Sequence, residues 1–182
     1  AWAAARLDLE AAATAMRDEL STQNAHVLVS LATVCHWLFD VPGTRRYARL
    51  ALRLAEQLDD RGIAAEAISA LAFADSSDGD LAASLKQYGR AFAIAGLHPS
   101  PHLVAAREMS ALVHYWRGEY SQAIAQGQAA LQFARDTGDT TSAARALGNL
   151  GLALTGVGRY GEALAMFSAA RRFCQEFGLQ QW

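Results

Sequence analysis

The chain has 182 residues, of which 52% are hydrophobic and 19% charged, so it can bury a core and is not intrinsically disordered. Its formal net charge of −2 excludes a whole-chain attraction to nucleic acid or to an anionic membrane. Two cysteines, Cys35 and Cys174, are too few for a disulfide framework or a four-cysteine zinc site. No apolar run approaches the roughly 20 residues of a membrane span. Abundant alanine and only three prolines predict an all-α fold.

The sequence repeats with a period of about 40 residues, which is typical of helical-repeat proteins. Gly-Glu-Tyr-Ser-Gln-Ala-Ile at 118–124 matches Gly-Arg-Tyr-Gly-Glu-Ala-Leu at 158–164, and residues 79–85 match both. In chain order we expect a helix in residues 1–24, from a truncated preceding repeat, and then repeats at 25–64, 65–103, 104–143 and 144–182. We expect these to form one continuous array within a fragment of a longer protein.

Each repeat is predicted to be a pair of helices joined by a short turn. In the last repeat Leu147, Leu150 and Leu154 recur at helical spacing, and Gly158 is expected to end that helix. In repeat 25–64, Phe39 stands where the other repeats have a turn glycine. The turn before the last repeat offers three candidate N-caps: Asp139, Thr140 and Thr141.

Residues 147–167 read Leu-x2-Leu-Gly-x2-Leu and then Ala163-x3-Phe167, which resembles the tetratricopeptide repeat pattern W-x2-L-G-x2-Y, A-x3-F. The closing proline of that pattern is absent, and the period exceeds the family's 34 residues. The longer form is similar to the repeats of maltose-regulator-like and LuxR-like bacterial regulators. The resemblance implies a right-handed α-α superhelix, a solenoid of about four hairpins plus an N-terminal helix.

In this family the first helices of successive repeats line a concave groove that binds a peptide or a protein segment. The resemblance implies that the following residues face the groove: His26, Ser30, Thr33, Trp37, Glu66, Ser69, Phe73, Glu108, Met109, Leu112, Tyr115, Trp116, Arg145, Asn149 and Leu152. Among them we expect Trp116 to anchor a partner and Asn149 to bond a peptide backbone. The alternative, that the aromatic residues pack on a neighbouring hairpin, stays open, above all for Trp37 and Tyr115.

Other reactive residues are predicted to be structural. Cys35 and His36 with His114 could form a nucleophile pair, but we expect Cys35 to be a small buried residue. His98 and His102 have a zinc-like spacing, yet they lie across a Pro-Ser-Pro linker without a nearby acidic or cysteine ligand, so no metal is expected. Six carboxylates at helix ends and turns are expected to be solvated: Glu56, Asp59, Asp60, Asp75, Asp78 and Asp80.

A basic stripe is predicted on the second helix of repeat 25–64. Arg45, Arg49 and Arg53 share one helical face, next to Arg46. We expect a solvated face that is balanced by three acidic residues: Glu56, Asp59 and Asp60. The alternative is a docking surface for an acidic flanking domain or, less favoured, for a nucleic-acid backbone.

Neither end of the array looks capped by polar residues, because both ends carry large apolar side chains. These are Trp2 at the first end and Phe173, Phe177 and Trp182 at the last. The chain is therefore expected to contact flanking domains or to form a homodimer through an end. The sequence predicts a non-enzymatic protein- or peptide-binding module of a bacterial, cytoplasmic transcriptional regulator or signalling protein, with no catalytic residue, cofactor, membrane or nucleic-acid partner. A scaffold for assembly or secretion is the alternative, whereas an enzyme is disfavoured because no acid, base and nucleophile share a site by spacing.

Overall fold

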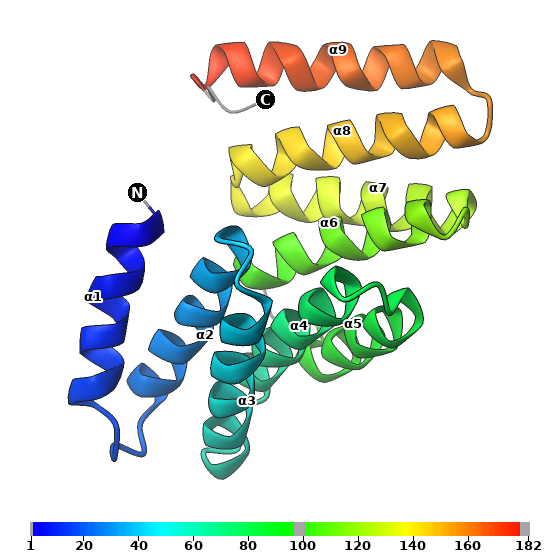
Figure 1. Cartoon of the computed structure of the whole chain (residues 1–182). Coiled ribbons are helices and arrows are strands. Elements are labelled where there is room, and N and C mark those ends of the chain that lie inside the picture. Colours follow the sequence, from blue (N-terminus) through cyan, green and yellow to red (C-terminus); the bar gives the residue numbers. More distant parts are fainter. Residues whose placement is uncertain (1, 97–100, 179–182) are drawn as a thin grey trace. The chain divides into compact units, whose positions relative to one another are not determined.

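The computed structural model describes residues 2–96 and 101–178, and within these ranges it contains nine α-helices and no strand (Figure 1). This confirms the predicted all-α, helical-repeat class. The helices are α1 (Trp2–Ala15), α2 (Thr22–Trp37), α3 (Val41–Gln57), α4 (Arg61–Ser77), α5 (Leu81–Ala95), α6 (Pro101–Trp116), α7 (Tyr120–Thr137), α8 (Thr140–Gly156) and α9 (Tyr160–Glu176).

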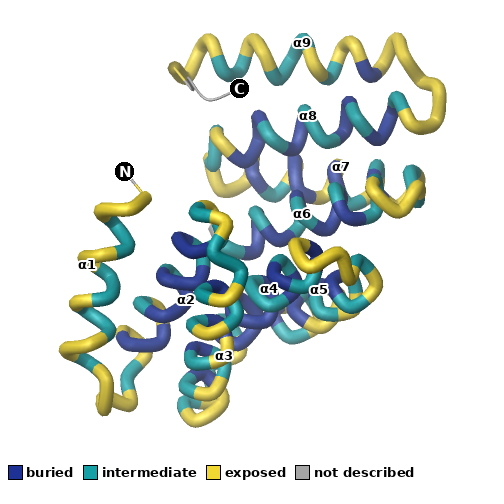
Figure 2. Tube along the Cα trace, in the orientation of Figure 1, coloured by how far each residue is buried: buried dark blue, intermediate teal, exposed yellow. Residues whose placement is uncertain are grey.

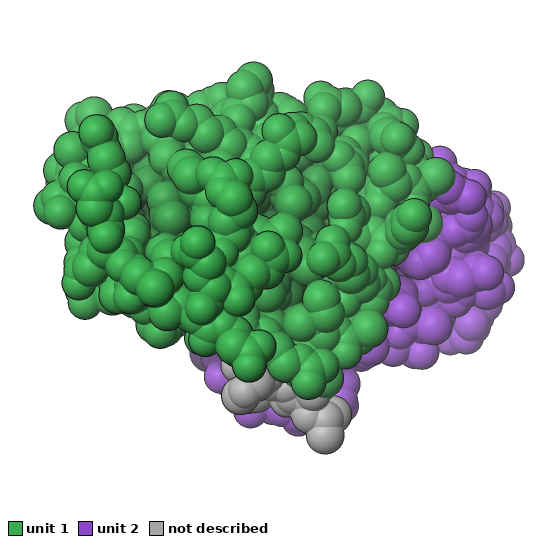
Figure 3. Space-filling model, turned by 90° about the horizontal axis from the view of Figure 1, so that it is seen from below, with its two compact units in different colours: residues 1–98 green, residues 99–182 purple. Residues whose placement is uncertain are grey.

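The chain divides into two compact units, Ala1–His98 and Pro99–Trp182 (Figure 3). In the first unit α2 packs on α1, α3 and α4, and α4 also packs on α3 and α5. In the second unit α8 packs on α6, α7 and α9, and α6 packs on α7. Each helix pair begins a few residues before the corresponding predicted repeat, and the continuity of the array stays a prediction.

Aspartates start four of the helices. Asp40, Asp60, Asp80 and Asp139 precede α3, α4, α5 and α8, and each accepts a hydrogen bond from the backbone N–H three residues later, at 2.9–3.0 Å. Such a cap satisfies a backbone donor that the first helical turn leaves without a partner. The predicted cap at Asp139 is confirmed, whereas Thr140 and Thr141 lie within the first turn of α8.

The turns between paired helices require a left-handed backbone. Gly79, Gly118 and Gly158 have φ of 87°, 75° and 76°, and Phe39 takes the same place between α2 and α3 with φ of 57°. A residue with a Cβ is strained in this region, whereas glycine enters it at little cost. The Phe39 side chain is 88% exposed, so packing does not compensate for the strain.

Replacing Phe39 with glycine is therefore expected to raise the free energy of unfolding by about 0.5–1 kcal/mol, because relief of the strain exceeds the added freedom of the unfolded chain. Gly79→Ala at the matching turn is the control and is expected to lower it by about 1 kcal/mol. Denaturant unfolding of both variants provides the measurement. A loss of stability in Phe39→Gly would contradict this explanation of the turn.

Small side chains let the helices pack closely in each core. One core cluster lies in unit 1 and comprises Ala25, Leu28, Val29, Ala51, Ala55, Ile63, Ala64 and Ala67. The other lies in unit 2 and comprises Val104, Ala130, Leu131, Ala134, Ala143, Ala146, Leu147 and Leu150. The terminal helices contribute little, because α1 has no buried residue and α9 has only Ala163 (Figure 2). No helix in the described part of the chain is long and apolar enough to cross a membrane.

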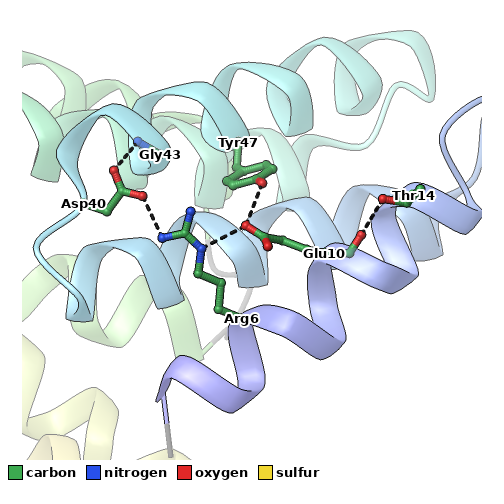
Figure 4. A network of polar contacts seen from close by, with 6 residues as sticks. All are labelled: Arg6, Glu10, Thr14, Asp40, Gly43 and Tyr47. Carbon is green, nitrogen blue, oxygen red and sulfur yellow. Dashed lines mark hydrogen bonds and ion pairs between the residues drawn. The ribbon is translucent and has the colours of Figure 1, made fainter.

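Polar contacts fasten α1 to the rest of unit 1 (Figure 4). Arg6 donates to Glu10 from Nε and to Asp40 from Nη1, both at 2.9 Å. The Tyr47 hydroxyl on α3 donates to the same Glu10 oxygen at 3.2 Å. Asp40 thus caps α3 with one carboxylate oxygen and pairs with α1 through the other. The helix expected within residues 1–24 is present and has a defined contact with its neighbours.

One prediction about the basic stripe is wrong. Arg45 on α3 pairs with Asp75, at 2.7 Å, and with Asp78 at the end of α4 in the next repeat, instead of joining a stripe balanced by residues 56–60. These hydrogen bonds raise the pKa of Arg45. Asp75 is largely buried in this pair and is not a solvated carboxylate. Arg49 and Arg53 are exposed, as predicted.

Candidate functional site

In unit 2 the candidate residues lie on two helices in contact, α6 and α8. Met109, Leu112 and Leu152 are partly buried, and Trp116 at the end of α6 is 50% exposed. Positions 109, 112 and 116 recur at helical spacing and share one side of α6. The two helices therefore present a row of apolar side chains that is neither closed into the core nor fully solvated.

A buried ion pair joins the same two helices. Arg145 on α8 donates from Nε to Glu108 Oε2 on α6 at 2.7 Å, and from Nη2 to Ser142 Oγ at 3.0 Å. The Glu108 residue is only 3% exposed. Its second oxygen, Oε1, accepts no hydrogen bond from any described residue. Such a pair fixes the separation of two helices, since each charge is costly to bury without the other.

Burial changes the acidity of Glu108. Removal from water disfavours the carboxylate and raises the pKa to about 7, although the charge of Arg145 and its hydrogen bond act in the opposite direction. Hydrogen bonding to Ser142 also lowers the pKa, and the charge of Asp139 raises it. The Glu108 carboxyl group therefore changes between its protonated and ionised forms near neutral pH.

Asn149 lies beside this pair. Its Nδ2 donates to the backbone carbonyl oxygen of Glu108 at 3.3 Å, which orients the amide between α8 and α6. Within residues 2–96 and 101–178 no group donates to Asn149 Oδ1. A half-buried amide with a fixed orientation and an available acceptor suits hydrogen bonding to the N–H of a bound chain.

Tyr115 is part of the hairpin packing. Its ring lies 5.8 Å from that of Tyr120, the first residue of α7. This matches the alternative that the sequence left open for Tyr115, packing between helices. Its neighbour Trp116 has no comparable ring contact among the described residues and is 50% exposed.

In unit 1 the candidate aromatics contact one another and Trp2, which the sequence argument had named only as an uncapped apolar residue at one end of the array. Trp37 on α2 stacks on Trp2 of α1, with ring centroids 6.0 Å apart, and meets His36 edge-on at 4.7 Å. The ring of His36 also contacts Phe73 on α4. Trp2 could have been identified only as an apolar residue at the chain start, since helical spacing within α1 does not reveal its partner.

The polar candidates of unit 1 differ in exposure. His26 is exposed and Ser30 is partly buried, whereas Glu66 and Ser69 are buried. Thr33 and Ser69 donate to backbone carbonyl oxygens four residues earlier, those of Val29 and Ala65. Both hydroxyl groups therefore form hydrogen bonds to the backbone of their own helix. The sequence pattern placed buried Glu66, Ser69 and Glu108 on the same face as exposed residues, because spacing alone does not show how closely the helices approach.

The described residues that were considered for chemistry are buried or hydrogen-bonded to neighbours in their own unit. Cys35 is fully buried, as predicted, and burial raises the pKa of its thiol. His114 lies in the other unit and contacts Glu119 through Nδ1 at 2.7 Å, a hydrogen bond that lowers the pKa of Glu119. In the described ranges no three His, Cys, Asp or Glu side chains could hold a metal ion together. His98 and Trp182 lie outside the described residues.

Comparison with known proteins bears on this arrangement. The sequence profile of the tetratricopeptide repeat family matches residues 103–176, which span α6 to α9. Residues 103–176 belong to the tetratricopeptide repeat family. The predicted family is thus confirmed for the part of the chain that carries the α6 and α8 candidates. No curated protein matches the sequence.

Solved tetratricopeptide-like structures share the fold. Aspartyl phosphate phosphatase F from Bacillus subtilis has a TM-score of 0.73 at 14% identity, over 86% of this chain and 41% of that one. The apo form of RapI has a TM-score of 0.70 at 15% identity, over 94% of this chain and 50% of that one. The kinesin light chain repeats of Podosopora anserina have a TM-score of 0.64 at 13% identity, over 94% and 86%. The chain thus spans less than half of the phosphatase structure.

The tetratricopeptide signature residues have a visible packing role. Gly151 faces Phe167 of α9, and a Cβ on Gly151 would lie 2.5 Å from Cε1 of that ring. The glycine and phenylalanine of the pattern therefore meet in the α8–α9 hairpin. Stacked hairpins of this kind expose extended surfaces that proteins of this fold use for protein–protein interaction.

Proposed function

We propose that the chain is a non-enzymatic interaction module and that unit 2 binds a peptide or an extended protein segment on α6 and α8. The observation that carries the proposal is the half-exposed Trp116 at the end of the apolar row on α6, together with the oriented amide of Asn149 on α8. Tryptophan is a frequent anchor of protein interfaces because it buries a large rigid surface. Asn149 would bond the backbone of the segment, and the apolar row would hold its side chains.

The remaining candidates divide by role. We assign partner contact to Met109, Leu112, Trp116, Asn149 and Leu152. Glu108 and Arg145 keep α6 and α8 in register beneath that face, since their charged atoms are engaged with each other. In unit 1 the Trp37 face, with His26, Ser30 and Phe73, is proposed as a second contact region that α1 borders through Trp2.

At the level of the whole protein, we propose the interaction region of a bacterial cytoplasmic regulator or signalling protein. The similarity in fold to RapI and to aspartyl phosphate phosphatase F, both longer chains, supports this role. Flanking domains would then receive the signal of partner binding from the repeats and produce the response.

The test is selection of binders from a random-peptide phage library on the whole chain. Trp116→Ala is expected to weaken the selected peptide about 30-fold or more, the loss typical of a buried anchor. Asn149→Ala is expected to weaken it about tenfold through lost hydrogen bonding to the peptide backbone. Both variants should melt close to the wild type, because neither side chain is in a core cluster.

Phe39→Ala is the matched control, since it removes an exposed aromatic side chain from unit 1. It should leave the affinity of the same peptide unchanged. The assignment of α6 and α8 would be contradicted if Phe39→Ala weakened binding as strongly as Trp116→Ala. It would also be contradicted if the Trp116 variant lost its binding only in parallel with its melting temperature.

A further inference from the structure

The solvent-facing side of α3 carries a stripe of arginines. Arg46, Arg49 and Arg53 are all exposed and are spaced three and four residues apart, so they share one side of the helix (Figure 2). The opposite side of α3 is buried through residues such as Ala48 and Ala51, and the helix packs on both α2 and α4. The stripe therefore lies on a helix that is held between others within unit 1.

The charges of this stripe are not balanced by the fold. Across the residues that the structure describes, Arg46, Arg49 and Arg53 form no ion pair with an acidic side chain. The charge of Arg46 lowers the pKa of Glu10, but that carboxylate is already bound by Arg6. Like charges three and four residues apart on a helix repel each other and lower its stability. The stripe thus keeps a repulsion that no ion pair of the described chain relieves.

The dimensions of the stripe indicate which anion fits it. Arg46 and Arg53 are seven residues apart, so the stripe extends about 10 Å along the helix axis. Carboxylates that recur every three or four residues on a second helix have the same spacing, so three of them can each meet one arginine. The planar guanidinium group can donate two parallel hydrogen bonds to one carboxylate. An acidic helical segment of about two turns therefore matches the stripe in charge and in length.

Acidic residues limit the stripe to this length. Glu56 is exposed, lies on the same side of α3 one turn after Arg53, and is followed by the exposed Asp59. A nucleic-acid strand that followed the helix would meet these two carboxylates, and the whole chain has a net charge of −2. A short acidic segment ends before it reaches them. Charge complementarity therefore favours a local protein partner over a long polyanion.

We infer that the stripe of Arg46, Arg49 and Arg53 is a docking surface for an acidic helical segment of a partner protein. Each arginine would pair with one carboxylate, and these pairs would offset the repulsion along α3. The stripe belongs to unit 1, whereas the proposed peptide-binding face belongs to α6 and α8 of unit 2. The two surfaces share no residue, so either can fail its test without the other.

The test is the binding of a fluorescein-labelled, capped, alanine-rich peptide with three glutamates spaced three and four residues apart. Fluorescence anisotropy with the whole chain in about 50 mM salt gives the affinity, because low salt leaves exposed charges weakly screened. The wild type should bind the same peptide with glutamines about tenfold more weakly. Arg49→Gln combined with Arg53→Gln should weaken the glutamate peptide about tenfold, because two of three ion pairs are lost.

Lys86→Gln combined with Arg90→Gln is the matched control, since it removes two exposed cations at the same spacing from α5 of the same unit. It should change the affinity by less than about twofold. The Arg49, Arg53 double variant should melt at the wild-type temperature or above it, because it removes a pair of like charges from α3. Its loss of binding then cannot come from loss of folding.

Three outcomes would overturn the inference. Equal losses in the two double variants would mean a diffuse attraction to the cations of unit 1. Equal affinity of the wild type for the glutamate and glutamine peptides would mean that the stripe does not recognise carboxylates. A mixed-sequence DNA duplex of about 20 base pairs tests the other class of anion and should bind more weakly than the peptide. A duplex that binds more tightly, and loses this advantage in the Arg49, Arg53 double variant, would identify a nucleic-acid surface instead.

Discussion

Replacing Arg145 with methionine is expected to lower the free energy of unfolding by about 3 kcal/mol at about pH 8, because the Glu108 carboxylate is then buried without its partner. Glu108 is almost fully buried, and Arg145 Nε is its charged partner at 2.7 Å. The methionine side chain keeps most of the apolar stem of the arginine, so lost packing contributes little. Denaturant unfolding followed by circular dichroism measures the loss.

The loss should shrink as the pH falls. The pKa of Glu108 in the folded chain, about 7, is above the ordinary value of 4.5, so folding favours its protonated form. Its contribution to stability is therefore fully present below pH 4.5 and declines as the pH rises through 7. In the methionine variant the carboxyl takes up a proton more readily still, and at about pH 5 the variant should recover most of its stability.

Two further variants assign the effect to this pair. Arg145→Met combined with Glu108→Leu removes both charges and should recover most of the loss at high pH. Arg117→Met removes an exposed arginine from its contact with Glu119 and should change the stability by less than about 1 kcal/mol. A pH-independent loss in the Arg145 variant, or a double variant no more stable than the single, would show that the buried charge is not the cause.

The same substitution at two glycines of α8 is expected to have opposite effects. A Cβ on Gly148 would have no atom within 4 Å, so Gly148→Ala should gain about 1 kcal/mol of stability from helix propensity. A Cβ on Gly151 would collide with the Phe167 ring, so Gly151→Ala should lose about 1–2 kcal/mol despite the same gain in propensity. Chemical denaturation of the two variants under one condition gives the comparison.

Leucine at position 167 provides a control for the close approach. Phe167→Leu shortens the side chain that faces Gly151, so Gly151→Ala should cost less in that background. Equal costs in both backgrounds would mean that the glycine is not needed for the α8–α9 contact. Stabilisation by Gly151→Ala in the wild-type background would mean the same.

The sequence predicted those parts of the fold that depend on local pattern. Leucine spacing located α8, Asp139 was identified as a helix cap, and Gly158 adopts the positive φ that ends the hairpin helix. These features depend on residues within one or two helical turns of each other. The repeat period then related each hairpin to the next, which is why the helix pairs could be anticipated from sequence alone.

The contacts between repeats could not be predicted in the same way. Glu108 and Arg145 are 37 residues apart, and both had been placed on a ligand-facing side because their helical positions fit it. Arg45 had been matched with nearby acidic residues, yet its partners lie 30 and 33 residues away, at the end of α4 in the next repeat. Spacing shows which side of a helix a residue occupies, but the depth of burial and the partner depend on how closely the neighbouring helix approaches.

The central claim is that α6 and α8 form the surface that takes a peptide. Its most direct test is an NMR titration of the isotope-labelled whole chain with a peptide selected on it. The account predicts that the Trp116 indole N–H and the Asn149 side-chain amide shift most, together with the amides around Met109, Leu112 and Leu152. Shifts confined to the outer sides of α7 and α9, with those two side-chain signals unchanged, would contradict it.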